Sequence, residues 1–395
     1  MRFKSCWRAV LTEDWQNGGF GIYIHWPFCE AKCPYCDFNS HVARKIDQAA
    51  WRRAYLSELK RAAAETPGRI VNAVFFGGGT PSLMDPETVA DVIACIRTLW
   101  PTANDLEVTL EANPSSVEAG RFAAYREGGI SRISMGVQAL NDVDLKRLGR
   151  THTSAEALRA FEIARNTFER VSFDLIYARQ HQTLADWGAE LEQALALAVD
   201  HLSLYQLTVE DGTAFGDRHA RGSLRGLPSD DFGADLYDLT QDVMGAAGMP
   251  AYEVSNHAAD GAASRHNLIY WRSGDYVGIG PGAHGRLTIG RTRMATICDS
   301  NPTRWLKSVA EATTEKPRET LGADDKASEF LLMGLRLKEG IDPDRYRQIA
   351  GRPLRLETLE HLEEIGMLVA ARNRIVVSNQ GFKVLNSVIE ALAPV

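Results

Sequence analysis

The chain has 395 residues, of which 45% are hydrophobic and 24% charged, as is typical of a folded protein with a sizeable core. Its net charge of −7, from 44 basic and 51 acidic residues, argues against binding nucleic acid or an anionic membrane through overall charge. The polar start of the chain and the lack of a long apolar run predict neither a signal peptide nor a membrane-spanning helix.

After a polar lead-in at residues 1–19, short segments rich in β-branched and aromatic residues alternate with amphipathic segments. The first kind predicts strands at 21–26, 71–78, 106–113, 132–138, 170–177 and 201–207. The second kind predicts helices at 47–65, 86–99, 115–127, 154–167 and 183–199. Such alternation is typical of parallel strands with crossover helices. We expect an α/β fold with an incomplete (β/α)6 barrel at residues 20–255, although an open doubly wound sheet shows the same alternation.

The regular alternation ends after the sixth predicted strand. Residues 208–230 are rich in glycine and predict loops, and a helix is expected at 231–247, followed by the strand-like stretch AYEVSN. The stretch GDYVGIGPGAHG, residues 274–285, predicts another glycine-rich turn region. We interpret residues 256–316 as a connecting region.

A smaller C-terminal domain is predicted at residues 317–395. Its pattern indicates helices at 324–337, 342–350 and 355–365, two short strands in MLVAARNRIVVS, and a helix at 379–391. Helices followed by a two-stranded wing are typical of a winged-helix-like α+β domain. Such domains often bind DNA, but residues 341–395 hold equal numbers of basic and acidic side chains, which gives no positive face for phosphates. We expect a role in packing against protein, and no nucleic-acid partner.

Three of the six cysteines lie close together, in the stretch CEAKCPYC. Clustered thiols in a chain without a predicted secretion signal indicate metal ligands in a reducing cytosol. A structural zinc ion needs four protein ligands, and the three cysteines could be joined by His25 or His41. A [4Fe–4S] cluster bound by Cys29, Cys33 and Cys36 leaves one iron open for another ligand. The spacing favours the cluster, and its place after the first strand puts it at the barrel face that carries chemistry.

The cysteine stretch matches the CxxxCxxC motif of radical S-adenosylmethionine enzymes, with Tyr35 before the last cysteine. Further motifs extend the resemblance to the C-terminus: FFGGGTPS, EANP, SMGVQ, DLIYARQ, LYQLTVE and HNLIYW. Together they resemble the HemW-type haem chaperones, which are relatives of the oxygen-independent coproporphyrinogen III oxidases. The resemblance implies that S-adenosylmethionine chelates the open iron. It also implies that an electron from the reduced cluster breaks the sulfonium bond to give a 5′-deoxyadenosyl radical.

Residues at the ends of the predicted strands are candidates for binding that cofactor. Consecutive glycines let a backbone approach a ligand closely, although they also form tight turns. Glu111 is suited to accept from ribose hydroxyls or to cap the next helix, and Asp174 is costly to bury without polar partners. Arg150 can pair with a carboxylate or lie on the surface. The resemblance implies that S-adenosylmethionine is bound by Tyr23, Tyr35, Gly78, Gly79, Thr80, Glu111, Gln138, Arg150, Asp174, Thr208 and His284.

Two stretches distinguish the chain from the oxidase relatives. The oxidases carry a fourth cysteine two positions after the last cluster cysteine, where this chain has Phe38. The HNLIYW stretch, residues 266–271, is a mark of the chaperone branch, and it implies that His266 ligates haem iron. Tyr270 and Trp271 offer flat apolar faces to a macrocycle. A His-Asn pair in a loop also serves as a hydrogen-bonding turn element.

We therefore expect a cytoplasmic haem chaperone that holds a [4Fe–4S] cluster, S-adenosylmethionine and haem, and that delivers haem to respiratory proteins. The resemblance leaves cleavage of S-adenosylmethionine open, and we name no residue as catalytic. The alternatives are an oxygen-independent coproporphyrinogen III oxidase and a structural zinc protein with a winged-helix interaction module. The resemblance further implies a homodimer and peripheral membrane association through partners.

Overall fold

The computed structural model of the chain describes residues 13–43, 45–114, 119–198, 200–371 and 373–394. Within these residues, an 11-stranded sheet has the order β13-β12-β11-β10-β1-β4-β5-β6-β7-β8-β9. Its parallel part consists of β10 (Asp275–Ile279), β1 (Phe20–Trp26), β4 (Val71–Gly78), β5 (Thr102–Ala112), β6 (Arg132–Gln138), β7 (Arg170–Tyr177) and β8 (His201–Gln206). All strands from β1 to β8 in this set were predicted from the sequence. The predicted α/β architecture is thereby confirmed.

The sheet extends beyond the predicted β/α units at both edges. Antiparallel strands there are β9 (Asn256–Ala258), β11 (His284–Ile289), β12 (Thr292–Ile297) and β13 (Glu319–Thr320). The prediction of a turn region at 274–285 is wrong for much of that stretch, because β10 pairs in parallel with β1 and places Val277 opposite Ile22. Gly278 is not a turn residue: a Cβ there would lie 2.0 Å from the carbonyl oxygen of His284 on the next strand.

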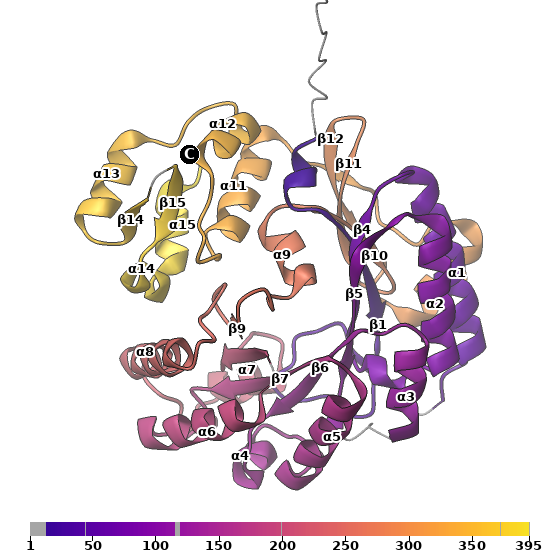
Figure 1. The fold of residues 1–395 in the computed structure, drawn as a ribbon, viewed down its shortest axis with the longest axis horizontal. Coiled ribbons are helices and arrows are strands. Elements are labelled where there is room, and N and C mark those ends of the chain that lie inside the picture. The colour runs from indigo at the N-terminus through magenta and orange to yellow at the C-terminus, as the bar shows by residue number, and fades with distance from the viewer. Residues whose placement is uncertain (1–12, 44, 115–118, 199, 372, 395) are drawn as a thin grey trace, which may run out of the picture.

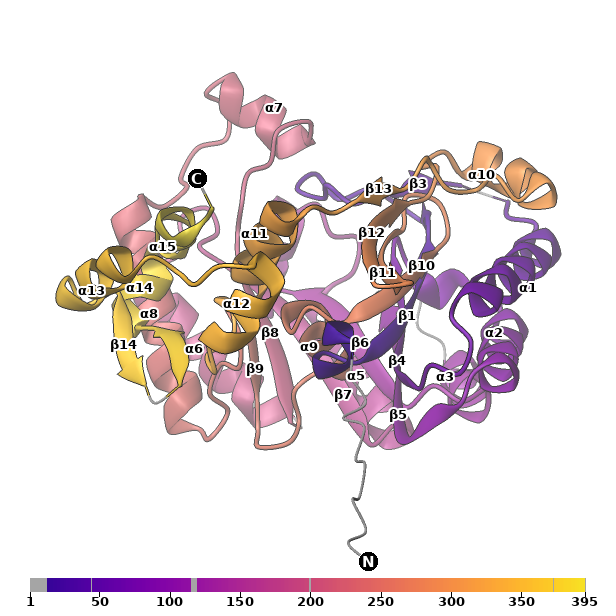
Figure 2. The same cartoon turned by 90° about the horizontal axis from the view of Figure 1, so that it is seen from above.

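Helices that follow the parallel strands cover the outer face of the curved sheet (Figures 1 and 2). The predicted ones are α1 (Gln48–Glu65), α2 (Pro86–Leu99), α3 (Ala119–Glu127), α5 (Ser154–Thr167), α6 (Leu184–Leu197) and α8 (Asp230–Ala246). Capping boxes at Thr153 and Thr183 fix the starts of α5 and α6. The sequence did not indicate α4 (Asp142–Arg147) or α7 (Ala214–Ala220), and α7 lies in a segment expected to form loops.

The largest apolar core lies between the sheet and its outer helices. β1 is buried on both faces, as expected for a parallel strand covered by crossover helices. Trp51 of α1 stacks on Trp305 of α10 (Pro302–Ser308), with ring centroids 5.4 Å apart, and meets Trp26 of β1 edge-on at 5.8 Å. The segment after the predicted barrel therefore contributes to the barrel's own core.

Short elements complete the barrel. They are η1 (Asp14–Asn17), β2 (Phe28–Cys29), β3 (His41–Val42), η2 (Pro81–Leu83), α9 (Arg265–Trp271) and η4 (Val309–Glu311). α9 lies on the inner side of the curved sheet (Figure 1). In the part of the chain that the structure describes, no helix combines the length and apolar character that crossing a membrane requires.

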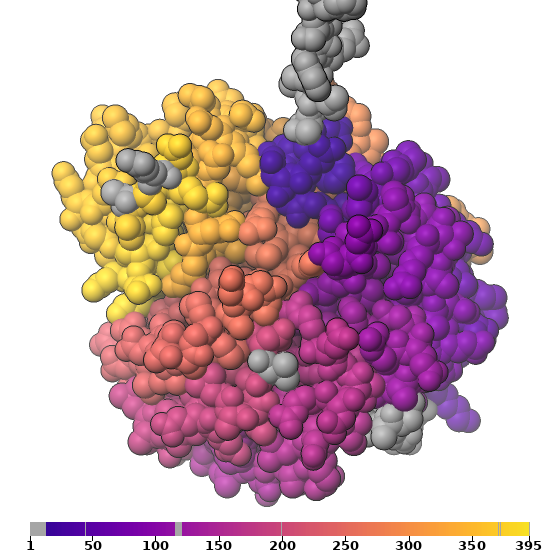
Figure 3. Space-filling model, viewed as in Figure 1, coloured from indigo at the N-terminus to yellow at the C-terminus, as the bar shows by residue number. Residues whose placement is uncertain are grey.

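The C-terminal residues form a separate lobe with its own core. Its elements are α11 (Ala323–Gly334), α12 (Pro343–Ala350), α13 (Leu356–Glu364), β14 (Leu368–Ala371), β15 (Arg374–Val377), α14 (Asn379–Lys383) and α15 (Leu385–Leu392). The helices and two-stranded sheet agree with a winged-helix-like domain, but the helix predicted at 379–391 is two helices, because Val384 leaves the helical conformation with φ of −124°. The yellow lobe adjoins the indigo start of the described chain (Figure 3), where Arg345 pairs with Asp14 at 2.7 Å.

Candidate functional site

The three clustered cysteines lie on the loop after β1, at the C-terminal end of the parallel strands. Cys29 ends β2, and Cys36 donates its backbone N–H to the carbonyl of Cys33 at 3.1 Å. The backbone N–H of His41 donates to the carbonyl of Pro27 at 2.7 Å and closes the base of the loop. All three thiols are partly buried, and burial raises the pKa of Cys29 and of Cys36. Among the described residues, no three His, Cys, Asp or Glu side chains converge as ligands of a single metal ion do.

Gly78 and Gly79 bring the end of β4 against the cysteine loop. The backbone N–H of Gly79 donates to the carbonyl of Trp26 at 2.7 Å, and that of Thr80 donates to the carbonyl of Phe28 at 2.8 Å. Gly78 has φ of 111°, a conformation that side chains disfavour. A Cβ on Gly79 would lie 2.6 Å from the carbonyl oxygen of Phe28. Glycine is therefore required at positions 78 and 79 for β4 to come this close to the cysteine loop.

Two partly buried carboxylates, Glu111 and Asp174, face the same region from β5 and β7. Glu111 accepts from the backbone N–H of Gly78 at 3.1 Å, but burial, and then the charge of Asp174, raise the pKa of Glu111 to about 8. Burial also raises the pKa of Asp174 to about 6, although hydrogen bonds from Ser203 and Ser134 oppose the shift. Oδ1 of Asp174 is buried without a hydrogen-bond partner among the described residues. Because such an acceptor is costly, the pair suits a ligand that brings hydroxyl or amino donors or positive charge.

Arg150 links the cysteine loop to β6. Its Nη1 donates to Sγ of Cys33 at 3.2 Å, and its Nη2 donates to the carbonyl of Gly136 at 2.8 Å. Gln138 ends β6 with φ of 74°, and the pairing with β7 shifts register between Gly136 and Gln138. Tyr35 lies beside Arg150, and burial raises the pKa of its hydroxyl. The cation thus holds the cysteine loop against the strand that carries Gln138.

The structure gathers most of the predicted site residues around one pocket, which we call the cluster pocket. Its predicted members are Cys29, Cys33, Cys36, Tyr35, Gly78, Gly79, Thr80, Glu111, Gln138, Arg150 and Asp174. Sequence reasoning did not single out Ser134, Gly136 or Asn113, which also line it, although the motifs SMGVQ and EANP contain them. Phe38 lines the pocket as well, with 56% of its surface exposed.

Three predicted cofactor residues do not line the cluster pocket: Tyr23, Thr208 and His284. The Tyr23 hydroxyl lies 2.9 Å from Nδ1 of His25, and Nε2 of His25 lies 2.9 Å from the carbonyl of Asn39. Both ring nitrogens of this alternative zinc ligand are therefore engaged. Thr208 follows β8 and His284 begins β11, so their roles stay predictions.

The HNLIYW stretch forms α9 rather than a loop, and side chains of the barrel anchor it. Glu107 of β5 accepts from the backbone N–H of Arg265 at 3.0 Å, at the start of the helix. Nδ2 of Asn267 donates to the hydroxyl of Tyr252 at 3.2 Å. These two bonds fix the first turn of α9 on the inner side of the sheet.

The imidazole of His266 is enclosed by aromatic rings. It stacks on Phe75 at 4.1 Å between centroids and meets Tyr270 edge-on at 4.4 Å. Only 5% of the residue is exposed, and burial, followed by the charge of Arg132, lowers the pKa of His266 to about 3. In this arrangement the ring is neutral at physiological pH and leaves no open face for a macrocycle.

Two family models match different parts of the chain. The model described as the Radical SAM superfamily matches residues 23–194, and the model described as the HemN C-terminal domain matches residues 321–384. All the cluster-pocket residues named above fall within the first match. The second match falls within the C-terminal lobe.

Curated relatives cover most of the chain. "Heme chaperone HemW" of Escherichia coli is 40% identical over 320 residues, which is 80% of this chain and 82% of that protein. "Heme chaperone HemW" of Mycobacterium tuberculosis is 36% identical over 378 residues, or 94% of each chain. "Radical S-adenosyl methionine domain-containing protein 1, mitochondrial" of Bos taurus is 38% identical over 384 residues, or 94% of this chain and 86% of that protein.

A solved structure also resembles the whole chain. Coproporphyrinogen III oxidase (HemN) from Escherichia coli, described as a radical SAM enzyme, superposes with a TM-score of 0.78 at 21% identity. The superposition covers 96% of this chain and 92% of the oxidase. At this level of identity the likeness shows a common fold.

Proposed function

The chain belongs to the HemW-type family of the radical S-adenosylmethionine superfamily, and we propose that it is a haem chaperone with a [4Fe–4S] cluster and S-adenosylmethionine in its cluster pocket. The observation that carries the proposal is that three thiols, a side-chain-free backbone edge and two desolvated carboxylates line one pocket. Curated relatives that span most of the chain are named heme chaperones. We further propose delivery of haem to respiratory proteins in the cytoplasm, as a homodimer that reaches membranes through its partners.

The cysteine side of the pocket fits a cluster with three protein ligands. Cys29, Cys33 and Cys36 supply thiolates from one loop, and three thiolates leave one iron of a [4Fe–4S] cluster open. Arg150 donates to Cys33 and offers a charge-assisted hydrogen bond to a ligated sulfur. When bound, the cluster and S-adenosylmethionine supply one-electron reduction of a sulfonium group.

The strand side of the pocket fits S-adenosylmethionine, which brings an amino group, ribose hydroxyls and a positive sulfonium. We assign the methionine part to the backbone edge at residues 78–80, where a ligand can approach closely. The unpartnered Oδ1 of Asp174 and the carboxyl of Glu111 are acceptors that the ligand's donors would satisfy. We assign to the same ligand Tyr23, Tyr35, Gln138, Arg150, Thr208 and His284.

Binding of S-adenosylmethionine to the reconstituted cluster tests this assignment. Adding S-adenosylmethionine to the reduced protein is expected to change the electron paramagnetic resonance spectrum of the cluster. Asp174→Asn, which keeps the shape of the side chain, is expected to lower the affinity for S-adenosylmethionine measured in that titration by about tenfold. Its iron content should stay unchanged, because Asp174 lies on β7 and not on the cysteine loop. Equal affinity of the two proteins contradicts the assignment, and one zinc per chain without iron contradicts the cluster.

The haem proposal rests on the relatives and not on the geometry around His266. Because α9 fills the inner side of the barrel and encloses the ring, the residues there do not fit a haem unless α9 is displaced. A haem titration of the wild type and of His266→Phe, which keeps an aromatic ring but cannot ligate iron, separates the possibilities. A changed haem spectrum in the variant supports His266 as ligand, and an unchanged spectrum assigns haem to another site. A wild type without saturable haem binding contradicts the chaperone function itself.

A coproporphyrinogen III oxidase is the second candidate, favoured by the shared fold of the solved oxidase. That likeness concerns architecture, and Phe38 stands where the oxidases carry a fourth cysteine. We therefore expect no protoporphyrinogen when the reduced, reconstituted protein is incubated anaerobically with coproporphyrinogen III and S-adenosylmethionine. Repeated turnover to that product would replace the chaperone proposal by the oxidase.

A further inference from the structure

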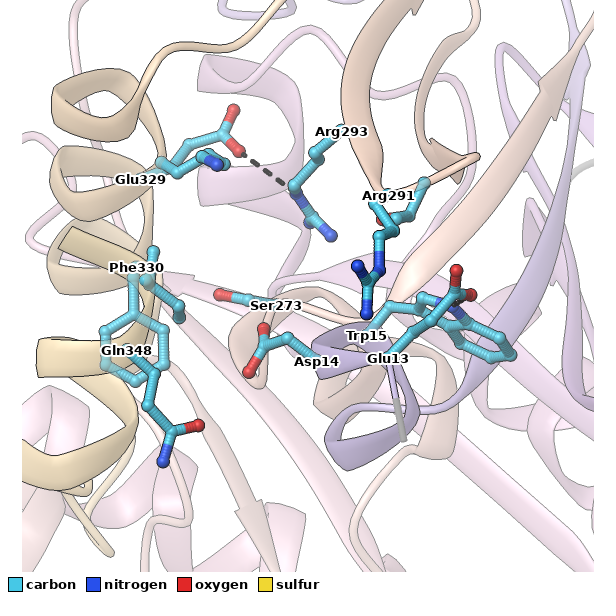
Figure 4. A pocket seen from close by; sticks show the side chains of 12 residues that line it. Glu13, Asp14, Trp15, Ser273, Arg291, Arg293, Glu329, Phe330 and Gln348 are labelled. Atoms are coloured by element: carbon cyan, nitrogen blue, oxygen red, sulfur yellow. Dashed lines mark hydrogen bonds and ion pairs between the residues drawn. The ribbon is translucent and has the colours of Figure 1, made fainter. Parts of the chain in front are cut away.

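A second cavity lies between the barrel and the C-terminal lobe. Its volume is about 270 Å³, and it shares no lining residue with the cluster pocket. Four parts of the chain form it: η1, the turn after α9, the β11–β12 hairpin, and the helices α11 and α12. Figure 4 shows Trp15 and Phe330 facing the cavity from opposite sides. We call it the junction pocket.

The acidic side chains of the junction pocket are already paired within the protein. Glu13 accepts from an indole N–H of the pocket wall at 2.6 Å. Asp14 pairs at 2.7 Å with Arg345, which does not line the cavity. Glu329 accepts from Nε of Arg286 at 2.6 Å. None of these carboxylates therefore depends on a ligand for a partner.

Two of the three basic side chains of the pocket have no such partner. Arg293 donates to Oδ1 of the buried Asp275 at 2.8 Å and lies 4.0 Å from a carboxylate oxygen of Glu329. The side chains of Arg291, which is exposed, and of Lys326 form no ion pair or hydrogen bond with any residue that the structure describes. Asp14 and Glu329 pair with Arg345 and Arg286, whereas Glu13 has no cationic partner in the described part of the chain. Because two free cations, Arg291 and Lys326, stand against this one carboxylate, the cavity is left with excess positive charge.

The polar groups of the pocket are held in place by the backbone. Ile289 pairs with Thr292, so the hairpin turns through Gly290 and Arg291 alone, with φ of 55° and 71°, which is the geometry of a tight two-residue turn. Ser273 also has positive φ, 55°, and its buried Oγ has no hydrogen-bond partner in the described part of the chain. Figure 4 shows Ser273 in the middle of the cavity wall and Arg291 reaching in from the hairpin. A polar group that is buried without a partner calls for an explanation, and a ligand supplies one.

We propose that the junction pocket binds a small organic anion with a flat apolar body. Its acid group pairs with Arg291 and Lys326 and accepts a hydrogen bond from Ser273, and its apolar body packs against the edges of Trp15 and Phe330 that line the cavity. The volume lies just below the usual range of small-molecule pockets, which fits one or two fused rings rather than a macrocycle. Because barrel and lobe both contribute walls, the bound anion holds the two together. The proposal is independent of haem binding.

Calorimetric titration of the full, cluster-reconstituted chain with 1-naphthoate tests the proposal, with uncharged 1-naphthamide as the matched probe. The acid is expected to bind at least about tenfold more tightly than the amide. A double variant that lacks both free cations, Arg291→Gln and Lys326→Gln, is expected to bind 1-naphthoate about tenfold or more weakly than the wild type. Arg347→Gln is the matched control, because this α12 residue is paired with Asp344, is 60% exposed and does not line the pocket. It should leave the affinity unchanged.

Thermal melting supplies a second readout that also shows whether the double variant is folded. 1-Naphthoate is expected to raise the melting temperature of the wild type and of Arg347→Gln, but not that of the double variant. S-adenosylmethionine binding in the cluster pocket should be the same in all three proteins. Equal affinities for acid and amide overturn the proposal. It is also overturned if the double variant binds 1-naphthoate as tightly as the wild type does, or if the wild type shows no saturable binding up to about 1 mM.

Discussion

The imidazole of His266 and the phenyl ring of Phe75 stack inside the barrel with their centroids 4.1 Å and their planes 15° apart. One ring comes from α9 and the other from β4, so the stack joins the HNLIYW helix to the central part of the sheet. Together with the bond from the start of α9 to Glu107, it makes this helix part of the barrel interior. The stretch therefore has a structural role that is independent of any ligand.

Removing the ring of His266 should cost stability through the space it leaves. His266→Ala is expected to lower the free energy of unfolding by about 2–4 kcal/mol, because the residue is 5% exposed and contacts two aromatic rings. His266→Phe keeps a ring in the stack and should cost less than about 1.5 kcal/mol. Urea unfolding of both variants measures the difference. Equal losses would show that the stack contributes little.

Glycine at position 79 should be required by sterics alone. Gly79→Ala places a Cβ 2.6 Å from a backbone oxygen and is expected to destabilise the protein by about 1–3 kcal/mol and to reduce iron incorporation. Gly245→Ala in α8 is the matched control, since a Cβ there meets no atom within 4 Å. It should be neutral or stabilise the helix by up to about 1 kcal/mol. Melting temperatures and iron content of the two variants, measured side by side, check both expectations.

The stability of the cluster-free protein should fall as the pH rises through the range in which Glu111 titrates. The pKa of Glu111 is raised from 4.5 to about 8, so between these values the folded chain binds more protons at this site than the unfolded chain. This contribution is present below pH 4.5 and is lost toward pH 8, with a slope of about 1 kcal/mol per pH unit. Glu111→Gln should flatten the curve of unfolding free energy against pH between about 5 and 8. An identical slope in variant and wild type would show that Glu111 titrates normally.

Loss of one clustered thiol should prevent assembly of the cluster. Cys33→Ser is expected to bind substoichiometric iron and sulfide after anaerobic reconstitution, because a three-thiolate site has no spare protein ligand. Cys95→Ser is the control, since Cys95 is also a free, partly buried cysteine but lies on α2. Iron and sulfide per chain are measured on both. Full loading of Cys33→Ser would falsify its role as a ligand.

Much of the barrel could be predicted from the sequence because the signals are local. The strand at 170–177 is a compact run of β-branched and aromatic residues, and the structure has β7 at the same bounds. The predicted helices α5 and α6 are N-capped by threonines that form capping boxes, so their starts depend on neighbouring residues only. Elements of this kind need no knowledge of what lies across the sheet.

The missed elements depend on distant partners. The glycines around Val277 are compatible with a turn or a strand, and only the approach of His284 to Gly278 explains why glycine is needed within β10. α9 has a short apolar run, and its place is set by Glu107 and Phe75, which belong to other strands. Sequence patterns do not reveal such pairings.

The candidate site likewise has a part that local sequence predicts and a part that depends on residues distant in the chain. The cysteine loop and the strand-end residues are carried by contiguous motifs, and these residues line one pocket. Asp174 could be predicted to face a polar region, but the burial of Glu111 and its proximity to Asp174, which raise the pKa of Glu111 to about 8, depend on strand order and register. The junction pocket has no motif at all, because its walls come from four separate parts of the chain.

The parallel pairing of β1 with β10 bears on how the chain can fold during synthesis. Ile22 emerges from the ribosome early, whereas its partner Val277 is made more than 250 residues later. Until then one edge of the first strand offers unpaired backbone groups, the condition that invites pairing with the wrong chain. During synthesis the nascent protein therefore has an unpaired strand edge beside its cysteine loop. Protection of that edge, by a chaperone or by rapid translation, should govern the yield of native protein.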